Sequence, residues 1–145
     1  MQTLISNRRA RFDFEILDTY EAGVELYGFE VKAIRAGSGT LEGAHVIVRG
    51  GEAYLVGASI APHQPANAPA HYDPERARRL LLSRREIEEL REVGDQKGLT
   101  TVPIMVHSKG RNVKLRLAVA RGKKKQERDI KYTALDFYFF FKHNF

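Results

Sequence analysis

The chain has 145 residues, a length that predicts one domain with a single core. Its 24 lysines and arginines outnumber 18 aspartates and glutamates, and the net charge of +6 favours a polyanionic partner, either nucleic acid or an anionic membrane. The absence of cysteine excludes disulfides and thiolate metal sites. No apolar run approaches the roughly 20 residues that span a bilayer, and the first residues lack a signal-peptide core, so we expect a cytoplasmic protein.

The amino-terminal segment combines a basic arm with the first predicted strand. Residues 1–6 are expected to be an untethered end. The arm that follows contains four polar or basic side chains of interest: Asn7, Arg8, Arg9 and Arg11. Apolar and polar residues alternate over 12–17, which predicts a strand directly after the arm. One interpretation is that this basic arm beside a sheet binds phosphates. A solvated charge cluster explains the same pattern equally well.

The segment 20–35 (YEAGVELYGFEVKAIR) contains a strand signal followed by a helix signal. Residues 24–27 alternate between apolar and other side chains, whereas apolar residues recur at helical spacing after Gly28. Gly37 stands where this helix would end, which leaves Lys32 and Arg35 facing outward. Glu21 is an isolated carboxylate in an otherwise basic setting.

The middle of the chain predicts a hairpin and then a long loop. Two short apolar runs over 44–58 flank the pair Gly50-Gly51, a favoured two-residue connection between antiparallel strands. Residues 60–74 contain four of the five prolines and are expected to form a surface loop. His63 and His71 lie in this loop without a carboxylate-rich partner motif, so we expect neither a metal nor another cofactor.

An arginine-rich segment precedes the clearest predicted helix. Five arginines surround the leucines at 80–82, and Ser83 with Glu86 three residues later forms a capping-box pattern for a helix that ends near Gly98. The glutamates of this helix are interpreted as a solvated face. Arg78, Arg79 and Leu82 are candidates for an RNA-facing surface, although the leucines are more typical of core residues.

Alternation over 102–106 and 113–120 around a polar turn predicts a second hairpin, with Lys114 and Arg116 facing outward. At least six short strands with one convincing helix between them indicate a mainly β fold. The predicted fold class is a closed antiparallel β-barrel of the oligonucleotide-binding (OB) type with about three covering helices. We assign this domain to residues 1–120 and a tail to residues 121–145.

The tail begins with a basic segment over 121–128 that has little apolar surface to bury. Such a segment either orders against RNA or serves as a solubilising tail, and composition alone does not separate these alternatives. Five of the eight phenylalanines then fall in the last nine residues, a pattern that favours strand pairing or aggregation. The segment 129–145 is therefore either a working tail or an altered terminus, such as the product of a shifted reading frame.

Five segments of the chain, in order, resemble the SmpB family of proteins that bind transfer-messenger RNA (tmRNA). They are 7–16 (NRRARFDFEI), 20–35, 73–82 (DPERARRLLL), 97–103 (KGLTTVP) and 120–124 (ARGKK). The resemblance covers about residues 7–128 and implies an OB-like barrel. Family tails continue as a segment rich in lysine, arginine and glutamate, whereas 129–145 differs; Gln126 and Phe12 also replace residues that are common in the family.

The resemblance implies a non-enzymatic RNA-binding protein of trans-translation. Such a protein binds the tRNA-like domain of tmRNA, enters the A site of a stalled ribosome in place of an anticodon arm, and places its tail in the decoding centre and mRNA channel. Elongation factor Tu and alanyl-tRNA synthetase are expected partners through the tmRNA. The expected phosphate-contacting residues are Asn7, Arg8, Arg9, Arg11, Lys32 and Arg35. The expected ribosome-facing tail residues are Gly122, Lys123, Lys124 and Arg128.

Glu21 has a different expected role because a carboxylate repels phosphate. It can accept a hydrogen bond from a base amino group or a 2′-hydroxyl, or orient a neighbouring arginine. The alternative to the tmRNA hypothesis is another OB-type translation factor that binds the ribosome without tmRNA. An RNA-processing enzyme is disfavoured, since the sequence has no paired carboxylates in a metal motif, no phosphate-binding glycine loop and no cysteine nucleophile.

Overall fold

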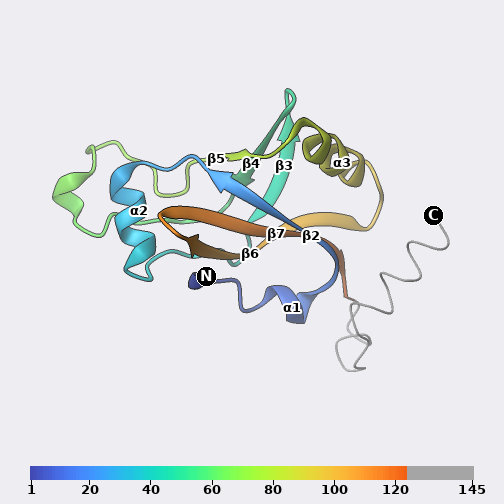
Figure 1. Cartoon of the computed structure of the whole chain (residues 1–145), viewed down its shortest axis with the longest axis horizontal. Helices are drawn as coiled ribbons and strands as arrows, with labels where there is room; N and C mark the ends of the chain where they lie inside the picture. The colour runs from blue at the N-terminus through green and yellow to red at the C-terminus, as the bar shows by residue number, and fades with distance from the viewer. Residues whose placement is uncertain (124–145) are drawn as a thin grey trace.

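The computed structural model describes residues 1–123 and forms a curved antiparallel sheet with helices at its ends and on its faces (Figure 1). In chain order the elements are β1 (Gln2–Ser6), α1 (Ala10–Asp13), β2 (Phe14–Val24), α2 (Gly28–Arg35), β3 (His45–Arg49), β4 (Glu52–Val56), the 3₁₀ turn η1 (Pro65–Asn67), β5 (Arg78–Leu81), α3 (Arg84–Gly94), β6 (Leu99–Lys109) and β7 (Asn112–Gly122). Within these residues the mainly β composition and the three α-helices agree with the sequence prediction.

The prediction of a closed barrel is wrong. The seven strands follow the order β1-β6-β7-β2-β5-β4-β3, so β1 and β3 are free edges and the sheet stays open. β3 and β6 lie close to each other but form no ladder of paired residues. The edge of β6 over 105–108 is instead occupied by β1, and α3 packs against both β3 and β6.

The amino-terminal segment also differs from its prediction. Instead of an untethered end, β1 pairs with β6 from Gln2 opposite Ser108 to Ser6 opposite Met105. Residues 12–17 do not form one strand, because Phe12 lies in the short helix α1 and the strand begins at Phe14. β1 is too short and too polar to be stable alone, so the backbone hydrogen bonds of β6 decide its conformation.

Both predicted hairpins are confirmed, and glycine explains their turns. Gly50 and Gly51 have φ values of +59° and +78°, the left-handed pair that a two-residue turn between β3 and β4 requires. Gly110 has a φ of +62° in the turn between β6 and β7. Each hairpin fixes the register of its strands and therefore the face on which each side chain lies.

The main hydrophobic core lies on the inner face of the curved sheet. It combines strand residues with side chains of the helices, and the buried members include Leu17, Leu55, Leu80, Leu115, Leu117, Ile34 of α2 and Leu90 of α3. A second, smaller cluster on the outer face contains Val102, Ile104, Ala118 and Ala120, which α1 covers with Ala10. Helix α3 begins as predicted, because Ser83 Oγ accepts from the Glu86 amide at 3.2 Å and the Glu86 carboxylate accepts from the Ser83 amide at 3.0 Å.

A buried carboxylate joins α2 to β5 and to the loop before it. Glu30 of α2 is fully buried and accepts a hydrogen bond from Arg78 Nη2 at 2.7 Å, and Arg78 is fully buried as well. The Tyr72 hydroxyl donates to the same carboxylate at 2.7 Å, and Arg76 forms an ion pair with it. The Tyr27 amide also donates at 2.7 Å, at the start of α2. Arg78 further donates to the carbonyl oxygens of the loop that crosses α2.

Removing the charge of Glu30 should destabilise the protein strongly. Glu30→Gln leaves the Arg78 guanidinium buried beside a neutral amide, so we expect a loss of about 3–5 kcal/mol in the free energy of unfolding. Urea denaturation followed by circular dichroism measures this loss. Glu52→Gln is the matched control, because Glu52 pairs with Arg79 while both side chains remain about 40% exposed, and it should barely change stability. Equal losses in the two variants would contradict the role of Glu30.

The same carboxylate should make the stability depend on pH. Burial alone would raise the pKa of Glu30, but hydrogen bonds from Arg76, the Tyr27 backbone, Tyr72 and Arg78 hold it below its ordinary value of 4.5. The stabilisation from a lowered pKa is fully present above the unfolded-state value and is lost as the pH falls through the folded-state value. We therefore expect Glu30→Gln to unfold with a smaller free energy than the unmodified protein by an amount that is constant above pH 4.5 and shrinks below it. Urea titrations at decreasing pH measure this difference. A difference that stays constant in acid would contradict this origin.

Candidate RNA interface

The outer face of the sheet carries a group of charged side chains beyond the part that α1 covers. Strand register places Glu21 of β2 opposite Arg116 of β7, and in the next row it places Gly23 opposite Lys114, which lies opposite His107 of β6. Side chains at directly paired positions share one face of a sheet. The inner face holds the intervening residues of the core, so these charged and ionisable side chains lie on the outer face.

Glu21 is surrounded by cationic and ionisable groups. Its Oε1 lies 2.9 Å from Nε2 of His107, and its Oε2 lies 3.5 Å from Nζ of Lys109. Burial alone would raise the pKa of Glu21, but the charge and hydrogen bond of Lys109, then His107 and Arg116, lower it. The side chain remains 36% exposed. Glu21 is thus an ionised hydrogen-bond acceptor, held in place and still open to a ligand.

His107 supports this arrangement from beneath. Its side chain is fully buried, and neither ring nitrogen has a hydrogen bond of ordinary geometry despite the short approach to Glu21. The imidazole therefore fills the space under the carboxylate and faces it with one nitrogen. Sequence reasoning missed His107 and Lys109 because their proximity to Glu21 depends on the register of three strands, and no local pattern reveals it.

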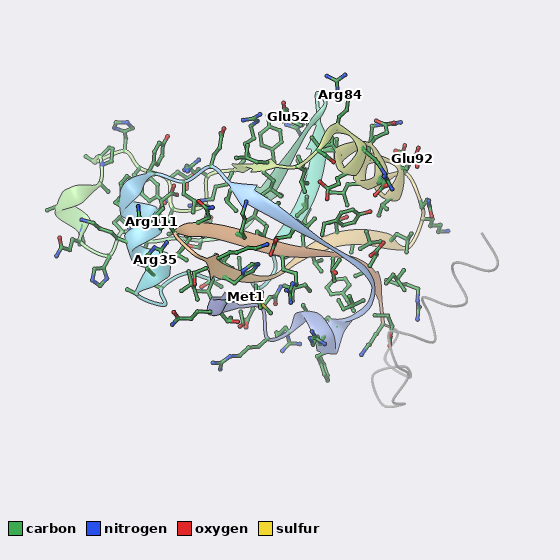
Figure 2. The ribbon with its side chains drawn as sticks, in the orientation of Figure 1. Met1, Arg35, Glu52, Arg84, Glu92 and Arg111 are labelled. Atoms are coloured by element: carbon green, nitrogen blue, oxygen red, sulfur yellow. The ribbon has the colours of Figure 1, made fainter. Side chains whose placement is uncertain are left out.

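Helix α2 adds two predicted residues to the same end of the molecule. Arg35 donates from Nη2 to the carbonyl oxygen of Arg111 at 2.9 Å, which ties α2 to the turn between β6 and β7. Figure 2 shows Arg35 and Arg111 close together at one end of the sheet. Lys32 is also exposed on α2. We call Glu21, Lys32, Arg35, Lys109, Arg111, Lys114 and Arg116 the sheet-end cluster.

The amino-terminal arm forms a separate basic region beside α1. Asn7 is half-buried and anchors the arm to β6. Its backbone N–H donates to the Ile104 carbonyl at 2.8 Å, and its side-chain Nδ2 donates to the Pro103 carbonyl at 2.9 Å. Arg8, Arg9 and Arg11 are exposed, and the Arg9 guanidinium lies 5.6 Å from the centre of the Phe12 ring. A hollow of about 470 Å³ lies next to the arm, lined in part by Asn7, Arg9 and Asp13.

The end of β7 is fastened to this arm. The Lys123 amide donates to the Asp13 carbonyl at 2.8 Å, and its Nζ donates to the Arg11 carbonyl at 2.9 Å and lies 3.7 Å from the buried Glu15 carboxylate. Gly122 is the last residue of the strand. The arm and the beginning of the predicted tail thus lie side by side. Lys124, Gln126, Arg128 and the phenylalanine-rich segment 129–145 lie outside the described residues.

The third predicted surface, on β5, does not exist as predicted. Arg78 is fully buried in the ion pair with Glu30, so it is a structural residue and is not available at the surface. Arg79 is engaged by two carboxylates, those of Glu25 and Glu52. Leu82 packs against the core, and the exposed leucine is Leu81, which has 49% of its surface accessible.

Leu81 instead belongs to the outer face of the sheet. It lies opposite Gly23 on β2, in the same row as Lys114 and His107. A side chain at position 23 would press on Leu81, since an added Cβ would lie 3.2 Å from the Leu81 Cβ. Gly23 thus lets Leu81 lie flat across β2. The result is one apolar side chain beside the sheet-end cluster, a combination suited to ribose or base edges.

No group of three or more His, Asp or Glu side chains within residues 1–123 is arranged to hold a metal ion, and His63 and His71 are both exposed. None of the helices in that range is long and apolar enough to cross a membrane.

An open antiparallel sheet whose exposed end gathers cations around a carboxylate is typical of a small β protein that binds a polyanion such as RNA. Comparison with known proteins gives the family: the model of the SmpB protein family matches residues 4–136. The chain therefore belongs to the SmpB family.

Relatives across bacteria agree with this assignment. The chain is 52% identical over 124 residues to the SsrA-binding protein of Synechococcus sp. (strain JA-3-3Ab), which covers 86% of this chain and 80% of the relative. It is 46% identical over 122 residues to the SsrA-binding protein of Burkholderia ambifaria, covering 84% of this chain and 82% of that one. A solved structure described as "tmRNA-SmpB: a journey to the center of the bacterial ribosome" superposes with a TM-score of 0.71 at 42% identity, covering 86% of this chain and 93% of the other.

The sheet-end cluster should dominate the salt dependence of RNA binding. Each cation that contacts a phosphate contributes about one unit to the slope of log affinity against log salt concentration, so Arg116→Gln should reduce that slope by about one. Fluorescence anisotropy with a labelled structured RNA over a salt series measures the slope. Arg91→Gln is the control, since Arg91 lies on α3 and pairs there with Glu88. If the two variants change the slope equally, binding is diffuse and the cluster has no special role.

Proposed function

We propose that this protein binds the tRNA-like domain of tmRNA and delivers it to the A site of stalled ribosomes, where it replaces the anticodon arm of a tRNA. Rescue of the ribosome and tagging of the nascent chain follow from that delivery. Membership of the SmpB family supports this function, as do the relatives named as SsrA-binding proteins and the solved tmRNA-SmpB structure. The observation in the molecule itself that carries the proposal is the ionised Glu21 among the cations of the sheet-end cluster.

The residues divide by physical role. Cations such as Lys32 and Arg35 attract phosphates and supply affinity without choosing a sequence. Glu21 supplies discrimination, because a carboxylate repels phosphate but accepts hydrogen bonds from base amino groups and 2′-hydroxyls of RNA. Arg8, Arg9 and Arg11 are proposed phosphate contacts of the arm. Asn7 acts indirectly, by fixing the arm to β6.

The arm and the tail are proposed to extend the interface toward the ribosome. Gly122 and Lys123 place the start of the tail beside α1, and Lys124 and Arg128 are proposed to continue it into the decoding centre and the mRNA channel. On this proposal residues 1–120 form the tmRNA-binding domain and 121–145 the tail, and the protein acts without catalysis in the cytoplasm. Elongation factor Tu and alanyl-tRNA synthetase would meet it only through bound tmRNA.

Replacing Glu21 should reduce discrimination more than affinity for RNA in general. Glu21→Gln removes a charged acceptor, and because a hydrogen bond to a charged group contributes about 1.5–3 kcal/mol, binding to the tRNA-like domain should weaken about ten- to hundredfold. Binding to ordinary tRNA should stay equal or strengthen, since the variant gains one unit of positive charge. Competition anisotropy, with the labelled tRNA-like domain and excess tRNA at fixed salt, measures both.

Glu88→Gln on α3 is the matched control, because it removes a carboxylate that pairs with an arginine away from the cluster. If the unmodified protein does not prefer the tRNA-like domain to tRNA, the proposed function is wrong. Retained contact with ribosomes in RNase-treated extract would then favour a translation factor that does not depend on tmRNA.

A further inference from the structure

A small hollow lined by aromatic rings lies between the start of α2 and the loop before β5. Its volume is about 210 Å³, and its walls include Tyr27, Phe29, Tyr72, His71 and Arg76. Ligand pockets for drug-sized molecules have volumes of about 300–1,000 Å³, so this hollow suits a single planar group. None of the roles assigned above uses it.

The three aromatic rings form one cluster, in which Tyr27 and Phe29 stack and Tyr72 meets Phe29 edge to face. The rings of Tyr27 and Phe29 are 5.5 Å apart between centroids at an angle of 25°, and Phe29 meets the edge of Tyr72 at 4.7 Å and 89°. The Arg76 guanidinium lies 4.3 Å from the centre of the Tyr27 ring. Tyr27 nevertheless keeps 54% of its surface accessible, which is unusual for a ring that already has a cation and a second ring beside it.

The walls of the hollow are held in place by Glu30. The Tyr27 amide and the Tyr72 hydroxyl each donate to its carboxylate at 2.7 Å, and Arg76 forms an ion pair with the same group. The Tyr72 hydroxyl, the Arg76 guanidinium and the backbone of Tyr27 are therefore held in place before any ligand arrives. Such preorganisation lowers the entropy lost on binding, so a single stacking contact becomes effective.

The charges around the hollow favour an aromatic group carried by a polyanion. Two guanidinium groups, those of Arg76 and Arg78, face the carboxylate of Glu30 and also offset the Asp73 carboxylate at the rim. Lys32 and Arg35 are exposed on the same helix. Asp73 lies at the rim, where its carboxylate can accept from an amino group. A nucleobase has the flat face, the edge donors and the attached phosphates that these features complement.

We infer that this hollow binds one unpaired nucleobase of RNA, stacked on the exposed ring of Tyr27. The inference rests on the proposed function, because it assumes that α2 faces bound RNA. The base belongs either to the tRNA-like domain or to ribosomal RNA, and the recognising chemistry is the same. A tyrosine ring accepts any base, so the contact adds affinity with little sequence preference.

Loss of the Tyr27 ring should weaken binding of the RNA that supplies the base. Stacking on an aromatic side chain changes affinity by about five- to 150-fold per base, so Tyr27→Leu should bind the tRNA-like domain or purified ribosomes more weakly by such a factor. Tyr27→Phe keeps the ring and should restore binding. Tyr54→Leu is the matched control: Tyr54 of β4 is a half-buried tyrosine that lies opposite Arg79, but it does not line this hollow.

A second measurement uses the natural absence of tryptophan from the chain. Tyr27→Trp introduces a single indole, whose emission should be quenched when a base stacks on it. Quenching by the tRNA-like domain assigns the base to tmRNA, and quenching only by ribosomes assigns it to ribosomal RNA. If the unmodified protein prefers the tRNA-like domain but Tyr27→Leu binds both partners normally and Tyr27→Trp is unquenched, this inference fails while the proposed function stands. If the unmodified protein shows no such preference, the proposed function itself fails.

Discussion

The fold depends on a carboxylate that is buried where charges are costly. Removing Glu30 from water is tolerable only because two guanidinium groups, a tyrosine hydroxyl and a backbone amide all donate to it. These donors come from β5, from the loop before it and from the first turn of α2 itself. Satisfying one buried charge therefore fixes the position of a helix, a long loop and a strand relative to one another.

The position of α2 then shapes the end of the molecule that is proposed to face RNA. Arg35 reaches from α2 to the turn between β6 and β7, which brings the helix cations next to those of the sheet. The short helix α1 matters as well. It covers an apolar part of the outer face of β2, β6 and β7 and leaves the charged part of that face uncovered. The uncovered part is the surface available to a folded RNA.

Local signals in the sequence were sufficient for several elements. The Gly50-Gly51 pair and the Ser83–Glu86 cap are short-range patterns whose geometry does not depend on the rest of the fold, and both are present in the structure. Features set by distant partners were not predictable in this way. β1 exists only through its pairing with β6, where it occupies the edge over 105–108. Arg78 looked like one of several surface arginines, yet its environment is decided by Glu30, 48 positions away in the chain.

Hydrogen exchange of the full chain, measured by mass spectrometry with and without the tRNA-like domain, tests most directly whether the end of the molecule organised by Glu30 is the RNA-facing one. We expect the bound RNA to slow exchange in α2, in the loop over 68–76 and in the turn between β6 and β7, with α3 unchanged. Protection confined to α3 and the β3–β4 hairpin, with α2 and that turn unaffected, would contradict the account.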